Sequence, residues 1–310
     1  MSINYHRDEC TWRRESEHRC PDPDIHVYLH KYGEKKIELE YGGDNPREWL
    51  NNDLYDERLD NIILIHGYNG GDDVLPTVIL RDTYCRNGSY NVFLVDWGAL
   101  GAAPCYPAAV VNLQYVAKCI SQMIMTLRDL GLSISRTTCV GHSLGAHLCG
   151  IMSNHLPFRM HKIVGLDPAK PLVRLGRPNR LNSRDADFVE VIHTNSGYYG
   201  DSMREGHVDF CANGGKSQPF CDNAVRNELC SHNWSVCFMA DSIDGRSNLF
   251  AEPCSGRCPP TRQMGPRSIN SLVIGQHTPT NTRGTFCVTA YDSPYCSKNH
   301  GDRGDERCCV

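Results

Sequence analysis

Residues 137–150 read Thr-Thr-Cys-Val-Gly-His-Ser-Leu-Gly-Ala-His-Leu-Cys-Gly, with Gly141-His-Ser-Leu-Gly145 at their centre. A strand-like run over 137–140 precedes Ser143, and a helix-compatible run over 144–156 follows it. A serine on such a tight strand-to-helix turn needs small neighbours, which glycine supplies on both sides. Free N–H groups at the start of the helix can also bind an anion. We therefore predict that Ser143 is a nucleophile; the alternative is a chance match of the pattern.

Short apolar runs alternate with helical patterns along the chain. The runs that predict buried strands are Asn61–His66, Asn91–Trp97, Thr138–Gly141, Lys162–Leu166 and Phe188–Thr194. Apolar residues three or four apart predict a core-facing helix from Val110 to Leu130. This alternation predicts an α/β fold with a mostly parallel central sheet and helices on both faces. His66, Ser143 and Asp167 would then follow strand ends at one edge, where functional loops gather.

Beyond Cys211 the patterns shorten, and cysteine, glycine and proline become frequent. We interpret this part as disulfide-rich loops and a closing element of the same domain, because no sustained apolar periodicity supports a second core. The sequence thus predicts an N-terminal extension over residues 1–24 and a single α/β domain over residues 25–310.

Composition excludes several classes of protein. The 310 residues carry a formal net charge of −4, which gives no basic footprint for nucleic acid, and no stretch of sequence is apolar enough for a transmembrane segment. The 17 cysteines indicate disulfides and an oxidising compartment, and their odd number leaves at least one unpaired within the chain. Residues 1–20 show no secretory signal. A cytosolic protein rich in free thiols is the alternative, but the cysteines cluster around predicted loops, so we predict secretion.

A serine hydroxyl needs an imidazole to accept its proton and an acid to orient that imidazole. Asp167 ends the fourth apolar run, and Pro168 should hold it extended, so we predict that Asp167 is the acid rather than an ordinary turn residue. The histidines that follow it are His193, His207, His232 and His277. His193 fits a core histidine within a strand, His277 lacks an obvious restraint, and His232 opens a helix-like run beside a cysteine. Spacing alone supports His232 no better than the others together.

Acyl transfer also needs donors for an oxyanion. We predict the backbone N–H of Leu144, directly after the nucleophile, and the N–H of Tyr68, in the glycine-rich loop 65–71. A plain glycine-rich turn is the alternative for that loop. A phosphate-binding loop is excluded because no Gly-Lys-Ser/Thr follows.

Several further motifs extend the pattern. In order, the chain contains His66-Gly-Tyr68, Gly141-His-Ser-Leu-Gly-Ala-His147, Gly165-Leu-Asp-Pro-Ala169, Val191-Ile-His-Thr194, Gly206-His-Val-Asp-Phe210, Asn213-Gly-Gly215 and Cys230-Ser-His232. The ordered series, from about Val27 to Cys296, resembles the pancreatic lipase family. The resemblance implies an α/β-hydrolase fold, with Ser143 as nucleophile, Asp167 as acid and His232 as base. It also implies oxyanion donors at Tyr68 and Leu144.

The chain departs from the pancreatic enzymes in three ways. Because the sequence ends at Val310, we expect no C-terminal β-sandwich domain like theirs. The lid segment between Cys221 and Cys230 has only eight, mostly polar, residues, and the loop between His193 and Gly206 is also short. These short loops resemble the secreted phospholipase A1 branch, which includes insect venom enzymes. Because such a lid offers little apolar surface, we expect an open site that admits bulky polar head groups.

A calcium site of the pancreatic branch maps loosely onto residues 180–185. Only Asp185 clearly offers a carboxylate there, and Asn182 is a weaker ligand, so we predict no metal and no cofactor.

The cysteines fit the same resemblance. Cys221 with Cys230 would hold the lid, and Cys287 with Cys296 would close a hairpin-like loop. Cys254-x-x-x-Cys258 and the adjacent Cys308-Cys309 suggest zinc, but no matching histidine spacing accompanies them, so disulfides are favoured.

Two N-glycosylation sequons occur. Asn87-Gly88-Ser89 fits a surface loop that could carry sugar, whereas Asn233-Trp234-Ser235 adjoins His232 and should stay unmodified.

Together these features predict a secreted serine esterase that acts on lipid at a membrane or micelle surface, most specifically a phospholipase A1 that cleaves the sn-1 ester. A triacylglycerol lipase or a galactolipase is the alternative among enzymes. A non-catalytic lipid carrier, similar to insect yolk proteins, is the alternative of another class. The three triad positions argue against the carrier, since the yolk proteins lack a working serine. The sequence makes no prediction of oligomeric state.

Overall fold

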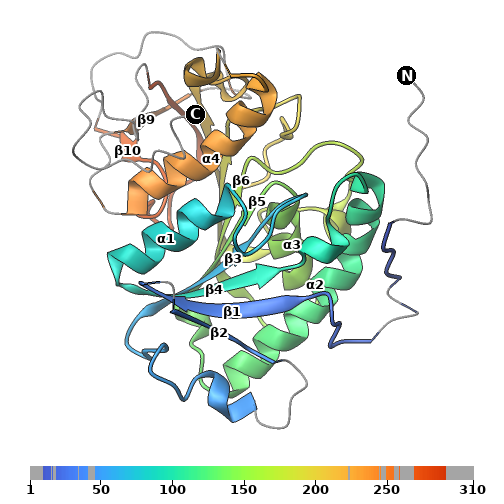
Figure 1. The fold of residues 1–310 in the computed structure, drawn as a ribbon. Coiled ribbons are helices and arrows are strands. Elements are labelled where there is room, and N and C mark those ends of the chain that lie inside the picture. Colours follow the sequence, from blue (N-terminus) through green and yellow to red (C-terminus); the bar gives the residue numbers. More distant parts are fainter. Residues whose placement is uncertain are drawn as a thin grey trace.

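One eleven-stranded sheet forms the centre of the molecule (Figure 1). The computed structural model describes residues 10–14, 16, 19–33, 35–40, 46–222, 224–243, 245, 249–254, 258 and 269–290. The strand order is β10-β9-β11-β8-β7-β6-β5-β3-β4-β1-β2. From β11 to β4 every neighbouring pair is parallel, whereas β1, β2, β9 and β10 pair antiparallel at the two edges.

The strands are β1 (His26–Lys31), β2 (Lys35–Glu38), β3 (Asp60–Ile65), β4 (Tyr90–Asp96), β5 (Thr137–His142), β6 (Met160–Leu166), β7 (Ala186–His193), β8 (Val208–Ala212), β9 (Phe250–Pro253), β10 (Leu272–Val273) and β11 (Gly284–Val288). The α-helices are α1 (Thr77–Asn87), α2 (Tyr106–Asp129), α3 (Leu144–Ser153) and α4 (Asn227–Ile243). Short 3₁₀ turns are η2 (Pro46–Trp49), η3 (Gly98–Leu100), η4 (Ile134–Arg136), η5 (Arg177–Asn179), η6 (Asn213–Gly215) and η7 (Pro219–Cys221).

The helices cover both faces of the sheet, as Figure 1 shows: α2 and α3 lie on one face, and α1 and α4 lie on the other. Side chains alternate between two apolar cores because successive strand residues point to opposite faces. In β3, Ile63 and Ile65 join the core under α2 and α3, whereas Ile62 and Leu64 join the core under α1 and α4. Burial on both faces explains the continuous apolar runs of the sequence.

The predicted α/β fold is confirmed, and the five predicted strands correspond to β3 to β7. Beyond Cys211 the structure contains more regular elements than the predicted loops, closing element and helix-like run at His232. Helix α4 has 17 residues, and β11 continues the parallel sheet beside β8. The short strands β8 to β11 have two to five residues each, too few for a clear periodicity.

Six disulfides join described residues, and they correct one predicted pairing. Cys221 pairs with Cys230 as expected, but Cys287 pairs with Cys254 and not with Cys296, which lies outside the described residues. Cys258 pairs with Cys211. Cys254 and Cys258, whose spacing suggested zinc, therefore both belong to disulfides. Cys308 and Cys309 also lie outside the described residues.

The remaining bridges include a pair that fixes the N-terminal segment. Cys10 and Cys20 are bonded to Cys105 and Cys119, which attach this segment to the start and the middle of α2. Cys139–Cys149 links β5 to α3 around Ser143. Within the described part, no helix is long and apolar enough to cross a membrane.

Candidate functional site

Ser143 occupies a strained turn between β5 and α3. Its φ of 58° and ψ of −119° lie outside the ordinary helix and strand regions. Glycine is required on both sides: a Cβ at Gly141 would lie 2.2 Å from the carbonyl oxygen of Gly145, and one at Gly145 would lie 2.1 Å from that of Ile65. The chain therefore turns sharply enough to lift the serine above the end of β5, as the predicted nucleophile turn requires.

Asp167 and His232 are joined by a hydrogen bond. The distance from His232 Nδ1 to Asp167 Oδ2 is 2.6 Å, and both residues are buried. The other carboxylate oxygen, Oδ1, accepts hydrogen bonds from the backbone N–H groups of Thr194 (2.8 Å) and Asn195 (3.0 Å). The two backbone N–H groups hold the carboxylate in place, and its hydrogen bond to the ring fixes the orientation of the imidazole.

Two local expectations about this pair need correction. Asp167 is not extended before its proline, because its φ is 41°, in the left-handed region that aspartate tolerates better than most residues. Its N–H instead donates to Ile192 O of the neighbouring strand at 2.8 Å. His232 does not open its helix either, since α4 begins at Asn227.

His142 connects the serine turn to His232. The two imidazole rings are 4.6 Å apart between centroids, and His142 Nε2 donates to His232 O at 3.3 Å. Burial, followed by the nearby His232, lowers the pKa of His142 well below its usual value, so its ring stays neutral. Within the described residues, no hydrogen bond joins Ser143 Oγ to His232 in this conformation.

The glycine-rich loop after β3 lies directly against the serine. A Cβ built on Gly67 would be 2.7 Å from Ser143 Cβ and 3.3 Å from Ser143 Oγ. This contact brings Tyr68, the residue after Gly67, close to the serine. Leu144 is the first residue of α3, so no helical carbonyl is available for its N–H. The two predicted donors therefore flank the serine from separate elements.

His66 holds this loop in place, a role that the sequence did not indicate. Its Nδ1 is 2.8 Å from Gly67 O, and a carbonyl can only accept, so Nδ1 carries a proton. The backbone N–H of Trp97 donates to Nε2 at 3.0 Å, and the indole ring stacks on the imidazole. Because Gly67 C=O and Tyr68 N–H belong to one planar peptide, fixing the oxygen also fixes the direction of the N–H.

Two other histidines of the motifs are structural. The predicted core position of His193 is confirmed: its ring is buried, Nε2 lies 2.9 Å from Asp209 Oδ1, and Nδ1 lies 3.1 Å from Asp201 O. Burial opposes its charge, but the hydrogen bond and charge of Asp209 outweigh burial and raise the pKa of His193 to about 9. His147 accepts from Leu181 N and donates to Ala169 O, which ties α3 to the loop after Asp167.

The region that resembled a calcium site contains an ion-pair network. Arg180 binds the carboxylates of Asp201 and Glu205 and is buried with them. Asp185 accepts hydrogen bonds from the backbone and side-chain nitrogens of Asn182, both at 2.8 Å. In the described ranges, no group of three or more His, Cys, Asp or Glu residues is arranged to hold a metal.

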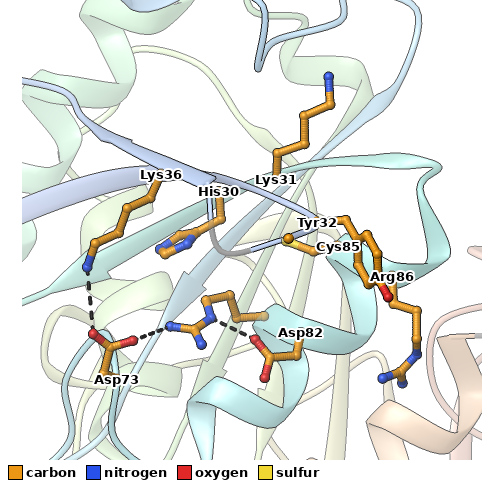
Figure 2. A pocket seen from close by; sticks show the side chains of 10 residues that line it. His30, Lys31, Tyr32, Lys36, Asp73, Asp82, Cys85 and Arg86 are labelled. Atoms are coloured by element: carbon orange, nitrogen blue, oxygen red, sulfur yellow. Dashed lines mark hydrogen bonds and ion pairs between the residues drawn. The ribbon is translucent and has the colours of Figure 1, made fainter.

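A cavity of about 680 Å³ opens elsewhere, beside β1 and α1, and Figure 2 shows its side chains. Part of its charge is paired: Asp73 pairs with Lys36 and Arg81, and Arg81 also pairs with Asp82. Lys31 and Arg86 are two further cations of the lining. Burial raises the pKa of the Cys85 thiol in its wall to about 12, so this cysteine is not a ready nucleophile. None of the predicted catalytic residues lines this cavity.

Comparison with known proteins gives a consistent result. The family model described as "Lipase" matches residues 45–258. Lipase member H-A of Xenopus laevis is 29% identical over 92% of this chain and 69% of its own length. Lipase member H and phospholipase A1 member A of Rattus norvegicus are 35% and 32% identical over 66% of this chain. The matched part covers only 50% and 46% of those two proteins.

Proposed function

Because this chain belongs to the Lipase family, whose model covers residues 45–258, we propose that Ser143, Asp167 and His232 form the catalytic triad of this ester hydrolase. The observation that carries the proposal is the 2.6 Å hydrogen bond between Asp167 and His232. It lies beside a serine on a strained strand-to-helix turn. The missing bond between Ser143 Oγ and His232 is compatible with this role, because catalytic hydrogen bonds often tighten only when substrate binds.

The proposed reaction follows from the roles of these groups. Ser143 Oγ attacks the ester carbonyl while His232 Nε2 accepts its proton, and Asp167 stabilises the charged imidazole. The N–H groups of Tyr68 and Leu144 bind the oxygen that becomes negative. His232 then gives its proton to the departing alcohol. Water attacks the acyl-enzyme with His232 again as base, and the fatty acid is released.

The proposed substrate is the sn-1 ester of a glycerophospholipid. The short lid supports this choice, because the bridge Cys221–Cys230 closes a segment of only eight residues. Such a segment covers less of the site than a long amphipathic lid and leaves room for a polar head group. A relative of similar sequence is named phospholipase A1 member A, which agrees with this choice.

The first experiment tests the triad. Wild type and Ser143→Ala are compared on p-nitrophenyl butyrate, a soluble ester, with thermal unfolding as the check that the variant folds. We expect the hydrolysis rate to fall by several orders of magnitude. Equal rates in the two folded proteins would refute the enzymatic role of Ser143 and favour a non-catalytic lipid carrier.

The second experiment tests the substrate. Phosphatidylcholine labelled separately in its sn-1 and sn-2 chains is presented beside triolein and a galactolipid. Release of the sn-1 label ahead of the sn-2 label supports a phospholipase A1. Release from triolein alone, or from the galactolipid alone, would contradict this substrate and identify a triacylglycerol lipase or a galactolipase.

We also propose that the protein is secreted. The six disulfides between described residues support an oxidising compartment. Asn87, at the end of α1, remains a candidate for glycosylation next to the exposed Gly88 and Ser89. Mass spectrometry of unreduced peptides from the native source tests both points, and fully reduced cysteines would contradict secretion.

A further inference from the structure

The proposed acid and base come from separate elements, so their alignment depends on how those elements are joined. Asp167 follows β6, His232 lies in α4, and 65 positions of sequence separate them. Their 2.6 Å hydrogen bond therefore requires α4 to be placed accurately against the end of β6. Catalytic groups have to be held to within about 0.5 Å of their productive geometry. Contacts that join the surroundings of the acid to α4 can provide this accuracy.

Asn195 joins the acid to this helix directly. Its backbone N–H donates to Asp167 Oδ1 at 3.0 Å, and its side-chain Nδ2 donates to Glu228 Oε2 at 2.6 Å. Glu228 lies in the first turn of α4, four residues before His232, so the two side chains share a face of the helix. The hydrogen bonds thus form a closed ring through the acid, Asn195, one turn of α4 and the base.

The side-chain amide of Asn195 is fixed in one orientation. Its Oδ1 accepts a hydrogen bond from the N–H of Tyr199 at 3.0 Å, and its Nδ2 also donates to Lys216 O at 3.0 Å. Both N–H bonds of the amide are therefore used, and turning the amide over would place a donor against a donor. The residue is fully buried, and a buried polar group that has all its partners is rigid.

Gln218 makes a second connection of the same kind. Its side-chain Nε2 donates to Thr194 O at 2.9 Å, and its backbone N–H donates to Ser231 Oγ at 3.0 Å. Thr194 is the other residue whose N–H holds Asp167, and Ser231 directly precedes His232. Each of the two residues that donate to the acid from the backbone is thus tied to α4 within about one turn of the base.

Resting on the proposed function, we infer that Asn195 and Glu228 are positioning residues, which hold the proposed acid against the proposed base. Asn195 acts through its backbone bond to Asp167, and Glu228 acts through α4. When His232 accepts the proton of the serine, its imidazole becomes charged, and a well-aligned carboxylate stabilises that charge. Because this stabilisation is greatest in the transition state, loss of the link should lower kcat and leave KM nearly unchanged.

Exchanging the amide and the carboxylate tests the link. Asn195→Asp keeps the shape of the side chain but places a second carboxylate against Glu228, and we expect kcat on p-nitrophenyl butyrate to fall about tenfold. Adding Glu228→Gln restores an N–H donor between the two side chains and the original total charge of the pair. The double variant should return kcat to within about threefold of wild type, because only Lys216 O then still faces a carboxylate.

A milder pair of variants tests the link from the helix and adds no buried charge. Glu228 is half-buried, so Glu228→Ala removes the acceptor of the bond without emptying the core. We expect it to lower kcat by about fivefold with KM little changed, whereas Glu228→Gln keeps an acceptor oxygen and should stay near wild type. The matched control is Asp60→Ala, which removes an exposed carboxylate bonded to Arg136 at the amino end of β3. Thermal unfolding shows that each variant is folded.

A spectroscopic measurement follows the same bond without turnover. The proton between His232 Nδ1 and the Asp167 carboxylate lies in a 2.6 Å hydrogen bond, so its nuclear magnetic resonance signal should be far downfield. The signal is assigned by its absence in His232→Gln. We expect Asn195→Asp and Glu228→Ala to move it upfield or to broaden it through exchange with water, and the double variant to restore it.

The two readouts separate the link from the proposed function. Unchanged kcat and an unchanged signal in folded Asn195→Asp and Glu228→Ala would overturn the positioning role. A loss of kcat that the double variant does not restore, or that Asp60→Ala reproduces, would overturn it as well. A wild-type protein that hydrolyses no ester, but whose downfield signal responds to these variants as expected, would instead refute the proposed function and leave the link standing.

Discussion

The carboxylate of Asp167 depends on backbone groups of the loop after β7. Thr194 and Asn195 donate to it, and Gly200 packs so closely that a Cβ there would lie 2.4 Å from Asp167 Oδ2. None of these contacts follows from the sequence motif around the aspartate. They depend on how the loop after β7 folds back over the end of β6.

His66 provides the sharpest prediction for a single residue. His66→Asn keeps an N–H donor near the position of Nδ1, whereas His66→Gln places its donor near Nε2. We expect kcat to fall about tenfold or more in His66→Gln and to be partly retained in His66→Asn, with KM little changed, because an oxyanion donor acts mainly in the transition state.

The measurement is steady-state kinetics on p-nitrophenyl butyrate, with thermal unfolding as a control. If both variants lose the same activity in proportion to lost stability, His66 supports only the packing against Trp97. A rise in KM without a change in kcat would also contradict the positioning role.

Helix α4 delivers the proposed base to the site. The bridge Cys221–Cys230 fixes its first turns, and His232 follows two residues later. The helix is also held by Phe220, whose ring lies 4.4 Å from that of Trp234. The position of His232 thus depends on a helix whose first turn is held by a disulfide.

Removal of this bridge should therefore affect both stability and activity. Cys221→Ser with Cys230→Ser should cost about 2–3 kcal/mol of unfolding free energy, from the entropy of a short loop. We also expect kcat on a soluble ester to fall, since the start of α4 becomes less constrained.

The control is Cys254→Ser with Cys287→Ser, which opens a loop with a sequence separation of 33 between β9 and β11. That pair should cost about 4 kcal/mol but spare kcat at a temperature where both proteins are folded. Urea unfolding and ester hydrolysis provide the two readouts. Equal effects on kcat would show that the lid bridge has no special role in placing the base.

The molecule as a whole is held together by long-range connections across one sheet. The disulfides at Cys10 and Cys20 span 95 and 99 residues of sequence and join the N-terminal segment to α2. The division into an extension over residues 1–24 and a domain over residues 25–310 remains a prediction. His193 and Asp209 connect the neighbouring strands β7 and β8 within the buried core.

His193 makes the global stability depend on pH. Its folded pKa of about 9 lies above the ordinary value of 6.5, so its contribution is complete below about pH 6.5 and disappears as pH rises through about 9. The shift corresponds to about 3 kcal/mol at most. Urea unfolding across this range should show the decline in wild type, and His193→Gln should remove that part of it. An unchanged slope in His193→Gln would contradict the assignment.

The sequence by itself determined the central layer and the sharp turn that carries Ser143, the proposed nucleophile. Continuous apolar runs predicted β3 to β7 because those strands are buried on both faces, and Gly141 and Gly145 predicted the turn at Ser143 because no side chain fits beside it. These are local properties, since each depends on a few neighbouring residues. The family resemblance, rather than spacing, selected His232 among the histidines.

Only the tertiary structure decided how distant residues meet. The pairing of Cys287 with Cys254, the parallel addition of β11 beside β8, and the donors to Asp167 all join segments far apart in the sequence. Periodicity and motif spacing describe one segment at a time and contain no information about such contacts. The meeting of Gly67, Ser143 and Asp167 is likewise decided by the sheet, because they come together only when β3, β5 and β6 end at the same edge.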